Sequence, residues 1–329
     1  MNTFGRLFRI SIFGESHGKW VGILLDGVPA GLPLRFADFE MDLARRRPGA
    51  KGTTPRREDD LGALKSGVFD DQTTGAPLLI EFENKAQDSA AYNHLKDHPR
   101  PGHADLTAWR KFGGYNDYRG GGHFSGRITL GLVAAGVVAK KLLGQITITA
   151  ALLEAGGSER IAENVAQAVD DGDSIGAILE CRASGVPVGL GEPFFDSVES
   201  LLSHIIFAIP GIRGIEFGAG FASARMKGSQ CNDPILAANG ATMTNHAGGV
   251  NGGITNGNDL SFRVAAKPTS SIAKEQRTIN LTTGAQTTLA VTGRHDACFA
   301  LRLPVVLEAA TAIVLADLML LEQHLSRVL

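Results

Sequence analysis

The sequence predicts an α+β fold, because segments with strand and helix patterns alternate without the regular spacing of repeated βαβ units. No repeat of fixed period runs through the chain, so a solenoid, a barrel or a doubly wound sheet is not required. The run at 125–143 is apolar nearly all round, which is typical of a helix buried on every side. No low-complexity linker divides the 329 residues, so we expect a single domain over 1–329.

The N-terminal part predicts two strands and a helix. Residues 8–13 and 20–26 have strand patterns around the turn Glu15-Ser16-His17-Gly18, which places His17 at the end of a strand. Residues 36–47 have helical spacing, and Pro48-Gly49 ends that helix. We therefore expect three consecutive arginines, 45–47, in its last turn, where cations complement the negative end of the helix dipole.

Further helices are expected along the rest of the chain. The apolar helix entered from the glycines at 120–122 ends at Gly144. Another begins at Asp196, with Glu199 in a capping-box position, and ends at Pro210-Gly211. The last runs from about Pro304 to 325, and the polar stretch 154–173 predicts a surface helix.

Composition indicates an ordinary globular protein with one concentrated positive region. Charged residues make up 20% and hydrophobic residues 43%, with a formal net charge of −2. A pI near 6.5 argues against a general nucleic-acid binder. Six basic residues nevertheless lie within 45–57, fenced by proline and glycine, which indicates a loop that binds phosphate or carboxylate. On its own, this cluster is more often a solvated loop than a binding site.

Three cysteines, far apart and without a CxxC pair, indicate neither a disulfide framework nor a zinc site. We expect a cytoplasmic protein. No histidine motif has metal-ligand spacing, so no metal site is expected. The N-terminus lacks the apolar core of a signal peptide, and the apolar runs at 128–139 and 303–321 are read as too short or too charged for a membrane span.

Several short motifs combine imidazole, guanidinium and glycine. Apart from the turn at His17, these are Arg100-Pro101-Gly102-His103, Arg119 to Arg127, Lys267 to Ser271, and Gly293-Arg294-His295-Asp296. Taken alone, the turns at His17 and His103 are more often structural, and a salt-bridged corner explains the motif at 293–296 equally well. The chain lacks a Walker motif, a Gly-x-Gly-x-x-Gly and a Gly-x-Ser-x-Gly, which disfavours an ATPase, a Rossmann dehydrogenase and a serine hydrolase.

The order of these motifs carries more information than any one of them. In sequence they are FGESHG at 13–18, DGVPAG at 26–31, RRRPG at 45–49, TTGAP at 73–77, RPGHAD at 100–105, DYRGGG at 117–122, SGVPVGLGEP at 184–193, IEFGAGF at 215–221, NHAGGVNGGITNG at 245–257, KPTSSIAKEQ at 267–276 and GRHD at 293–296. This series resembles the chorismate synthase family over essentially the whole chain.

The resemblance implies a lyase that converts 5-enolpyruvylshikimate 3-phosphate to chorismate and phosphate by 1,4-elimination in the shikimate pathway. It implies reduced FMN as cofactor, with NADPH as a source of reducing equivalents, although no net oxidation occurs. It also implies a sandwich of antiparallel sheets with buried helices between them, and a homotetramer. The small-molecule substrate is the expected partner, with no nucleic acid and no membrane.

Site residues follow from the same resemblance. His17 is expected as general acid beside the substrate phosphate, His103 beside the flavin, and Asp296 as proton acceptor. Four arginines would bind the anionic substrate: Arg46, Arg47, Arg100 and Arg127. Flavin contacts are expected from His123, Phe124, Ser125, Pro210, Gly211, Gly252, Lys267, Pro268, Thr269, Ser270, Ser271 and Arg294.

The chain departs from the family pattern after the glycines. Many members read Arg-Ser-Ser-Ala-Arg-Glu-Thr where this chain has His123-Phe124-Ser125-Gly126-Arg127-Ile128-Thr129. Flavin affinity therefore depends on replaced residues. Two alternatives stay open at this point: a flavin-dependent oxidoreductase acting on an anionic small molecule, and a catalytically silent flavin- or anion-binding module. The second is disfavoured because His17, His103 and Asp296 are all present.

Overall fold

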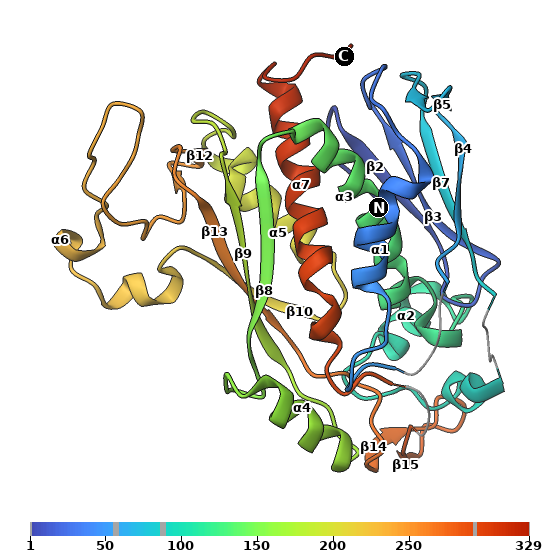
Figure 1. The fold of residues 1–329 in the computed structure, drawn as a ribbon. Helices are drawn as coiled ribbons and strands as arrows, with labels where there is room; N and C mark the ends of the chain where they lie inside the picture. The colour runs from blue at the N-terminus through green and yellow to red at the C-terminus, as the bar shows by residue number, and fades with distance from the viewer. Residues whose placement is uncertain (1, 55–58, 86–89, 292–294, 329) are drawn as a thin grey trace.

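Two antiparallel sheets enclose a layer of helices (Figure 1). The computed structural model describes residues 2–54, 59–85, 90–291 and 295–328. Helices α1 (Glu40–Arg46), α3 (Thr129–Leu143), α5 (Val198–Ile206) and α7 (Pro304–Leu321) lie between the sheets. Every pairing within the two sheets is antiparallel among the described residues, so the predicted α+β sandwich with buried helices is confirmed.

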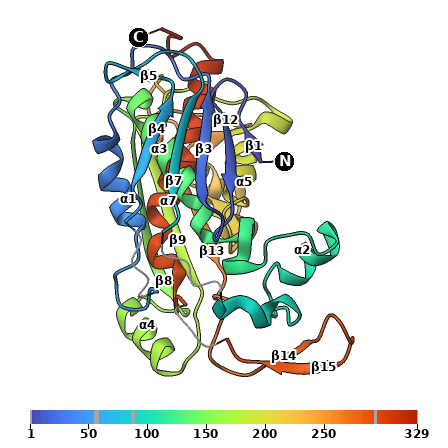
Figure 2. The same ribbon diagram turned by 90° about the vertical axis from the view of Figure 1, so that its right-hand side faces the viewer.

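One sheet has five strands and faces the viewer in Figure 2, with the helices behind it. In spatial order its strands are β1 (Thr3–Phe4), β2 (Arg9–Gly14), β3 (Trp20–Asp26), β7 (Leu78–Glu83) and β4 (Gly62–Ser66). The strand predicted at 20–26 is confirmed, and the one predicted at 8–13 is β2, one residue later. Alternate residues of β7 are buried, as expected for a strand with one face on the core.

The other sheet has four strands, in the order β10 (Ile212–Phe217), β13 (Leu260–Ala266), β9 (Ala177–Ser184) and β8 (Thr147–Ala155). Strict alternation of buried residues along β13 shows that only one face meets the helices. Three two-stranded ribbons complete the strands: β5 (Val68–Phe69) with β6 (Gln72–Thr73), β11 (Val250–Asn251) with β12 (Ile254–Thr255), and β14 (Gln276–Ile279) with β15 (Gln286–Leu289).

Three helices lie outside the central layer. Helix α2 (Asp105–Phe112) and helix α4 (Ile161–Asp170) lie at the lower end of the sandwich, and α6 (Gly228–Cys231) belongs to an arm that projects from the four-stranded sheet (Figure 1). The predicted polar helix within 154–173 is α4. The structure therefore separates a packed centre from a lower end built of short elements and loops.

The centre of the core is the contact between α3 and α7, which are buried along almost their whole length. Gly136 makes this approach possible, because a Cβ there would lie 2.3 Å from the Cβ of Ala309 on α7. Helix α3 also contacts β3, and α7 contacts β8, so the pair links the two sheets. The predicted burial of the apolar helix on every side is confirmed for its apolar residues, whereas Lys140 and Lys141 in its last turn are partly exposed.

Several helix boundaries differ from the sequence prediction. The helix predicted over 36–47 is a 3₁₀ turn, Phe36–Phe39, followed by α1 from Glu40, and α5 ends at Ile206, short of the predicted Pro210-Gly211. Helix α5 begins at Val198, because Ser197, and not Asp196, caps it by accepting a hydrogen bond from the Ser200 backbone N–H. Helix α7 ends at Leu321, short of the predicted 325. The reading of 303–321 as too short or too charged is also wrong, because α7 could cross a membrane on length and composition alone. Its most apolar stretch is 89% buried inside the protein, as in a core helix.

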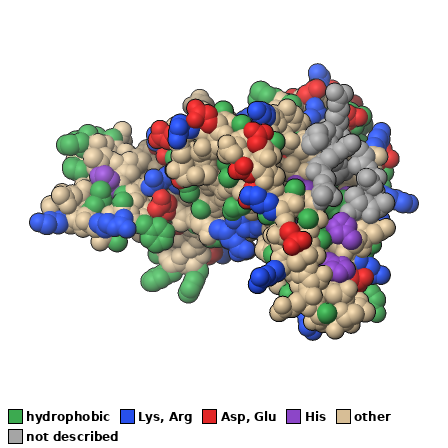
Figure 3. Space-filling view, turned by 90° about the horizontal axis from the view of Figure 1, so that it is seen from below, with side chains coloured by type: hydrophobic (Ala, Val, Ile, Leu, Met, Phe, Trp, Pro, Cys, Tyr) green, Lys and Arg blue, Asp and Glu red, His purple; other side chains and the backbone are tan. Residues whose placement is uncertain are grey.

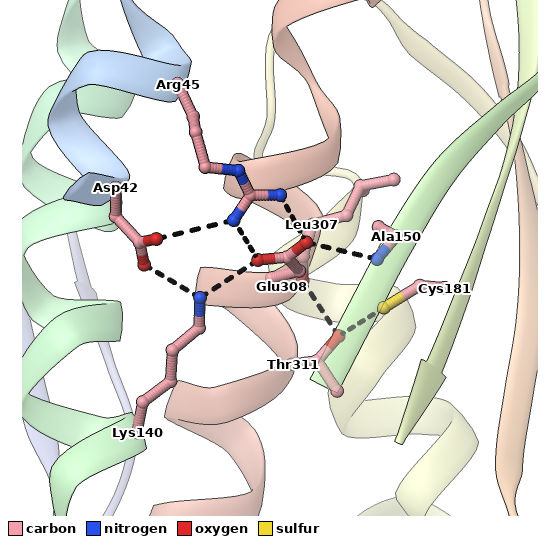
Figure 4. A network of polar contacts seen from close by, with 8 residues as sticks. All are labelled: Asp42, Arg45, Lys140, Ala150, Cys181, Leu307, Glu308 and Thr311. Atoms are coloured by element: carbon pink, nitrogen blue, oxygen red, sulfur yellow. Dashed lines mark hydrogen bonds and ion pairs between the residues drawn. The ribbon is translucent and has the colours of Figure 1, made fainter. Parts of the chain in front are cut away.

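Helix α1 is fixed to this core by a charge network in which the carboxylates are buried and Arg45 and Lys140 are partly exposed (Figure 4). The Arg45 guanidinium donates to both carboxylate oxygens of Glu308 on α7, at 2.6 and 2.7 Å. Lys140 on α3 donates to Asp42 at 2.7 Å and to Glu308 at 3.0 Å. Burial alone would raise the pKa of Glu308, but Arg45 and Lys140 hold that pKa below its ordinary value. The carboxylate therefore stays ionised and joins α1, α3 and α7.

We expect Glu308→Gln to lower the free energy of unfolding by about 3 kcal/mol, because Arg45 and Lys140 would lose a buried counter-ion. Urea denaturation followed by circular dichroism measures this change. Glu322→Gln, at the exposed end of the same helix, is the control and should change stability by less than about 0.5 kcal/mol. A loss below about 1 kcal/mol for Glu308→Gln would mean that the network behaves as a surface ion pair.

Candidate active site

A cavity of about 1620 Å³ gathers most of the predicted site residues. This is larger than the roughly 300–1,000 Å³ typical of a single small-ligand site. The predicted residues that line it are His17, Arg46, Arg100, His103, His123, Phe124, Ser125, Arg127, Pro210, Gly211, Lys267, Pro268, Thr269, Ser270, Ser271 and Asp296. They come from strand ends and loops across the whole chain, so the fold brings distant motifs together.

Two predicted residues that the structure describes, Gly252 and Arg47, are not among the residues that line the cavity. Gly252 is exposed on the β11–β12 hairpin, away from the cavity lining. Arg47 does not line the cavity but lies next to it through its contacts with the segment that precedes β4. Arg294 lies outside the described residues.

The two predicted catalytic histidines lie against neighbouring residues of one glycine loop. A Cβ at Gly120 would lie 2.5 Å from Cδ2 of His17, and a Cβ at Gly121 would lie 3.4 Å from Cε1 of His103. Gly120 has φ +59°, and any side chain there would collide with the His17 ring. The glycines thus let the backbone pass close to both imidazoles. His17 is 3% exposed and meets the Tyr92 ring edge to face at 5.0 Å.

His103 is held by an arginine and a carboxylate. Arg100 donates from Nε and from a terminal nitrogen to the two oxygens of Asp105, at 2.7 and 2.8 Å. His103 Nδ1 lies 2.5 Å from Asp105 Oδ1 and 3.1 Å from an Arg100 nitrogen. The shorter contact to a carboxylate requires the proton on Nδ1, which makes Nε2 an acceptor in the neutral ring. Arg100, predicted to bind substrate, therefore also braces this pair.

The pKa of His103 is lowered in the folded protein. Burial is the main cause, the charge of Arg100 adds to it, and the hydrogen bond to Asp105 opposes it. The pKa of Asp105 is also lowered, because the hydrogen bonds from Arg100 and His103 outweigh its burial. The arrangement favours an ionised Asp105 and a neutral His103 near neutral pH.

Asp60 is a buried carboxylate that the sequence analysis did not single out. It lies close to Arg46 and Arg47 of the basic cluster and to Arg127 before α3. It accepts a hydrogen bond from Arg46 at 2.9 Å and pairs with Arg127 through its other oxygen. Nε of Arg47 lies 3.7 Å away. The only signal in the sequence was the acidic run at 58–60 directly after the basic residues. Arg46 and Arg47 of the basic cluster are thus paired with a buried carboxylate, whereas Lys51 is exposed and Arg56 and Arg57 lie outside the described residues.

Asp296, the predicted proton acceptor, is held by two donors. The backbone N–H of Thr54 donates to Oδ1 at 2.6 Å, and Arg302 donates to Oδ2 at 2.5 Å. Arg302 lines the cavity and was also missed from the sequence, because it lies six residues further along the chain with no motif of its own. Next to Asp296, the pKa of His295 is lowered by burial and by the charge of Arg100.

The segment from Lys267 to Ser271 presents polar groups to the cavity. Lys267 Nζ donates to Ser270 Oγ at 2.7 Å, and Ser271 Oγ accepts from Arg100 at 3.0 Å. The Thr269 hydroxyl is buried and makes no hydrogen bond within the described part of the chain. Burial lowers the pKa of Lys267, with a contribution from Arg213. This segment therefore offers hydroxyl and ammonium donors to an anionic ligand.

His123, the first residue that departs from the family pattern, forms hydrogen bonds with other parts of the protein. Its Nδ1 donates to the carbonyl oxygen of Gly14 at 2.7 Å, and Nε2 lies 3.2 Å from Asn2 Oδ1. Phe124 leaves its ring 39% exposed at the cavity, 6.4 Å from the ring of Phe112. Here the chain presents an apolar ring where many relatives have a serine.

A group of three or more His, Cys, Asp or Glu side chains that could hold a metal ion is absent from the described ranges. Figure 3 views the molecule from the end at which α2, α4 and the β14–β15 hairpin lie, and lysine and arginine side chains gather near the middle of this face. The chemistry offered is that of guanidinium, imidazole, hydroxyl and carboxylate groups.

Comparison with known proteins agrees with this geometry. The family model described as chorismate synthase matches residues 8–320. A chorismate synthase of Chitinophaga pinensis is 61% identical over 329 residues, covering 100% of this chain and 99% of the relative. One from Dehalococcoides mccartyi is 45% identical over 360 residues, covering 100% and 99%. A crystal structure of chorismate synthase matches with a TM-score of 0.73 at 27% identity, covering 97% of this chain and 93% of that one.

We expect the protein to lose thermal stability as the pH falls from about 7.5 to about 5.5, because the unfolded chain protonates at His103 below about pH 6.5 while the folded protein resists that proton. His295 acts in the same direction. In His103→Asn the fall in melting temperature should be smaller. His324→Asn, at an exposed histidine, should keep the full fall. An identical pH dependence in His103→Asn and the unmutated protein would contradict this reading.

Proposed function

Because the chain belongs to the chorismate synthase family and converts 5-enolpyruvylshikimate 3-phosphate to chorismate and phosphate, we propose that the large cavity is where this elimination occurs. The observation that carries the proposal is the convergence of His17, His103 and Asp296 with three arginines on one cavity. The segments that bring them together are far apart in the sequence. A flavin oxidoreductase would not require this combination of acid, base and arginines.

Substrate binding is assigned to the guanidinium groups. The substrate carries a phosphate and two carboxylates, and arginine is the side chain best suited to such groups because its planar fork can donate two parallel hydrogen bonds. Arg46, Arg127 and Arg100 line the cavity. Arg47 does not line it, but its Nε lies 3.7 Å from the Asp60 carboxylate that pairs with Arg46 and Arg127. Their positive charge compensates the substrate in a site from which water is partly excluded.

His17 is the proposed general acid at the phosphate. Its ring lies at the strand end between β2 and β3, buried and in contact with Tyr92. Proton donation to a phosphate oxygen makes phosphate a better leaving group, and imidazole suits this because its ordinary pKa lies near neutrality. The ring is held by the glycine loop on one side, which fixes its direction.

Asp296 is the proposed acceptor for the ring hydrogen that leaves as a proton. Thr54 and Arg302 hold one oxygen each, so the carboxylate is fixed in position. Its four acceptor positions are not exhausted by two hydrogen bonds. The carboxylate can therefore accept the proton without first changing its orientation, which favours proton transfer.

The family requires a reduced flavin, and we propose reduced FMN as the cofactor here, with NADPH as a source of its reducing equivalents on resemblance alone. The residues fit such a group. The buried Thr269 hydroxyl needs a partner, and Lys267, Ser270 and Gly126 line the same cavity, where a Cβ on Gly126 would meet no atom within 4 Å. When bound, the reduced flavin supplies the electron density that helps expel phosphate. The remaining flavin contacts proposed from the family, including Pro210, Gly211 and Arg294, rest on resemblance.

A homotetramer is the proposed assembly. The arm at 218–247 exposes large apolar side chains, including Phe221 and Ile235 at 79% each. Hydrophobic side chains are visible at the left of Figure 3, where the arm projects. Exposed apolar groups of this kind favour a protein partner. Gly252, exposed away from the cavity, could contact flavin only from a neighbouring copy, which agrees with assembly. A cytoplasmic location is proposed because all three cysteines are free thiols.

We expect His17→Ala to reduce kcat by about 10²–10⁴-fold, as for the loss of a general acid, while the dissociation constant of FMN stays unchanged. An anaerobic assay with photoreduced FMN and 5-enolpyruvylshikimate 3-phosphate, following chorismate formation, gives kcat. Flavin fluorescence gives the dissociation constant.

His324→Ala serves as the matched control, because it removes an exposed imidazole far along the chain, and its turnover should equal that of the unmutated protein. Unchanged turnover in His17→Ala would remove His17 from the mechanism without affecting the family assignment.

Light scattering after size exclusion should give a mass of four chains of 34.7 kDa. Phe221→Asp should lower that mass, because a charge would replace an apolar contact at the arm. Phe69→Asp, at a residue 71% exposed on the β5–β6 ribbon, should leave the mass unchanged. A monomeric unmutated protein would contradict the proposed assembly.

A further inference from the structure

The carboxylate of Asp60 is enclosed by three guanidinium groups that come from two different parts of the chain. Arg46 ends α1, Arg47 follows it directly, and Arg127 lies in the turn before α3. The Asp60 side chain is 0% exposed, and those of Arg46 and Arg127 are 3% and 5% exposed. The carboxylate is thus a shared counter-ion between α1 and the start of α3.

Asp60 contacts the arginines but does not line the cavity itself. Arg46 and Arg127 line the cavity, whereas Asp60 does not. Each of its oxygens faces a different arginine, Oδ2 toward Arg46 at 2.9 Å and Oδ1 toward Arg127. Arg127 is held further by its Nε hydrogen bond to Asn84 Oδ1 at 3.1 Å. The carboxylate therefore sets the separation and direction of the two guanidinium groups that face the cavity.

The backbone at Asp60 is in an uncommon conformation. Its φ is +49°, in the left-handed region that side chains other than glycine rarely adopt, although aspartate and asparagine tolerate it best. The neighbouring carbonyl of Asp59 accepts a hydrogen bond from Arg47 at 2.7 Å. An uncommon backbone conformation is maintained where the surroundings fix it, and here the surroundings are the arginines themselves.

Electrostatics explains why a carboxylate is needed here. Three guanidinium groups close together and largely buried repel one another, and each has lost part of its hydration. The Asp60 carboxylate compensates part of this charge, so the repulsion falls while Arg46 and Arg127 remain at the cavity to attract a phosphate or carboxylate.

We propose that Asp60 is a positioning residue for the substrate-binding arginines: it holds Arg46, Arg47 and Arg127 in the geometry that receives the anionic groups of the substrate. This inference rests on the proposed placement of the substrate in the cavity. It assigns Asp60 no contact with substrate, so its effect must pass through the arginines.

If Asp60 acted only through its charge, the effect of its removal on phosphate affinity would have the opposite sign. If Asp60 only neutralised positive charge, Asp60→Asn would raise the net positive charge of the site, and inorganic phosphate would bind more tightly. If Asp60 positions the arginines, the same change weakens binding despite the added charge. The sign of the change in affinity therefore separates the two roles.

The experiment compares Asp60→Asn with Asp59→Asn, which removes the same charge from the exposed neighbouring residue and leaves its carbonyl in place. Titration calorimetry on FMN-free protein measures binding of inorganic phosphate and of 5-enolpyruvylshikimate 3-phosphate. Steady-state assays with reduced FMN give kcat and KM. We expect Asp60→Asn to weaken both ligands and to lower kcat/KM by about 10²-fold, mainly through KM, with Asp59→Asn unchanged. Tighter phosphate binding in Asp60→Asn would overturn the proposal.

Asp60→Glu covers the case in which Asp60→Asn does not fold. Glutamate retains the charge and the fold's counter-ion but moves the carboxylate by one methylene, so positioning predicts a raised KM and weaker substrate binding. Unaltered KM and affinity in Asp60→Glu would overturn the proposal. Failure of the unmutated protein to bind the substrate in calorimetry would instead contradict the proposed placement of the substrate.

Discussion

Buried arginines can be kept in this protein only because carboxylates are buried with them. A guanidinium group removed from water loses hydration, and the loss is tolerable when a carboxylate and further hydrogen bonds replace that water. The pairs are Arg46 and Arg127 with Asp60, Arg100 with Asp105, and Arg302 with Asp296. Each pair has an arginine that lines the cavity. Positive charge can thus face a ligand while the fold remains stable.

The central layer of helices makes these pairs possible. Helix α7 supplies Glu308, which fixes α1 through Arg45, and α1 carries Arg46 into the cavity. The same α1 is tied to α3 through Asp42 and Lys140, and the turn before α3 carries Arg127. The apolar contact at Gly136 and Ala309 sets how closely α3 and α7 approach. Packing in the core therefore determines the distance between arginines at the site.

The sequence predicted helices and strands, because their patterns lie within a short stretch of residues. It missed contacts between residues that are far apart in the sequence. The strand pattern beside the turn at His17 predicted 20–26, and all-round apolar character predicted the burial of α3, because each pattern is local in the sequence. Asp60 and Arg302 escaped notice because their roles depend on partners brought close by folding, such as Arg127, 67 residues away from Asp60. The start of α5 was missed because Asp196 and Ser197 are both good caps, and only the backbone geometry selects Ser197. Motif order located the cavity residues, but the hydrogen bonds that orient them needed the structure.

The structure shows what His123 and Ile128, which depart from the family pattern after the glycine loop, do in this protein. Where many relatives have an arginine, His123 ties the loop to β2 and to the N-terminus, so this position stabilises the loop rather than supplying a full charge. Where they have a glutamate, Ile128 is 7% exposed and packs in the apolar core. The residue next to Arg127 therefore offers no carboxylate, and within the described residues the Arg127 guanidinium donates to Asp60 and to Asn84. The geometry of the anion site therefore depends on Asp60, the carboxylate that joins Arg46 to Arg127.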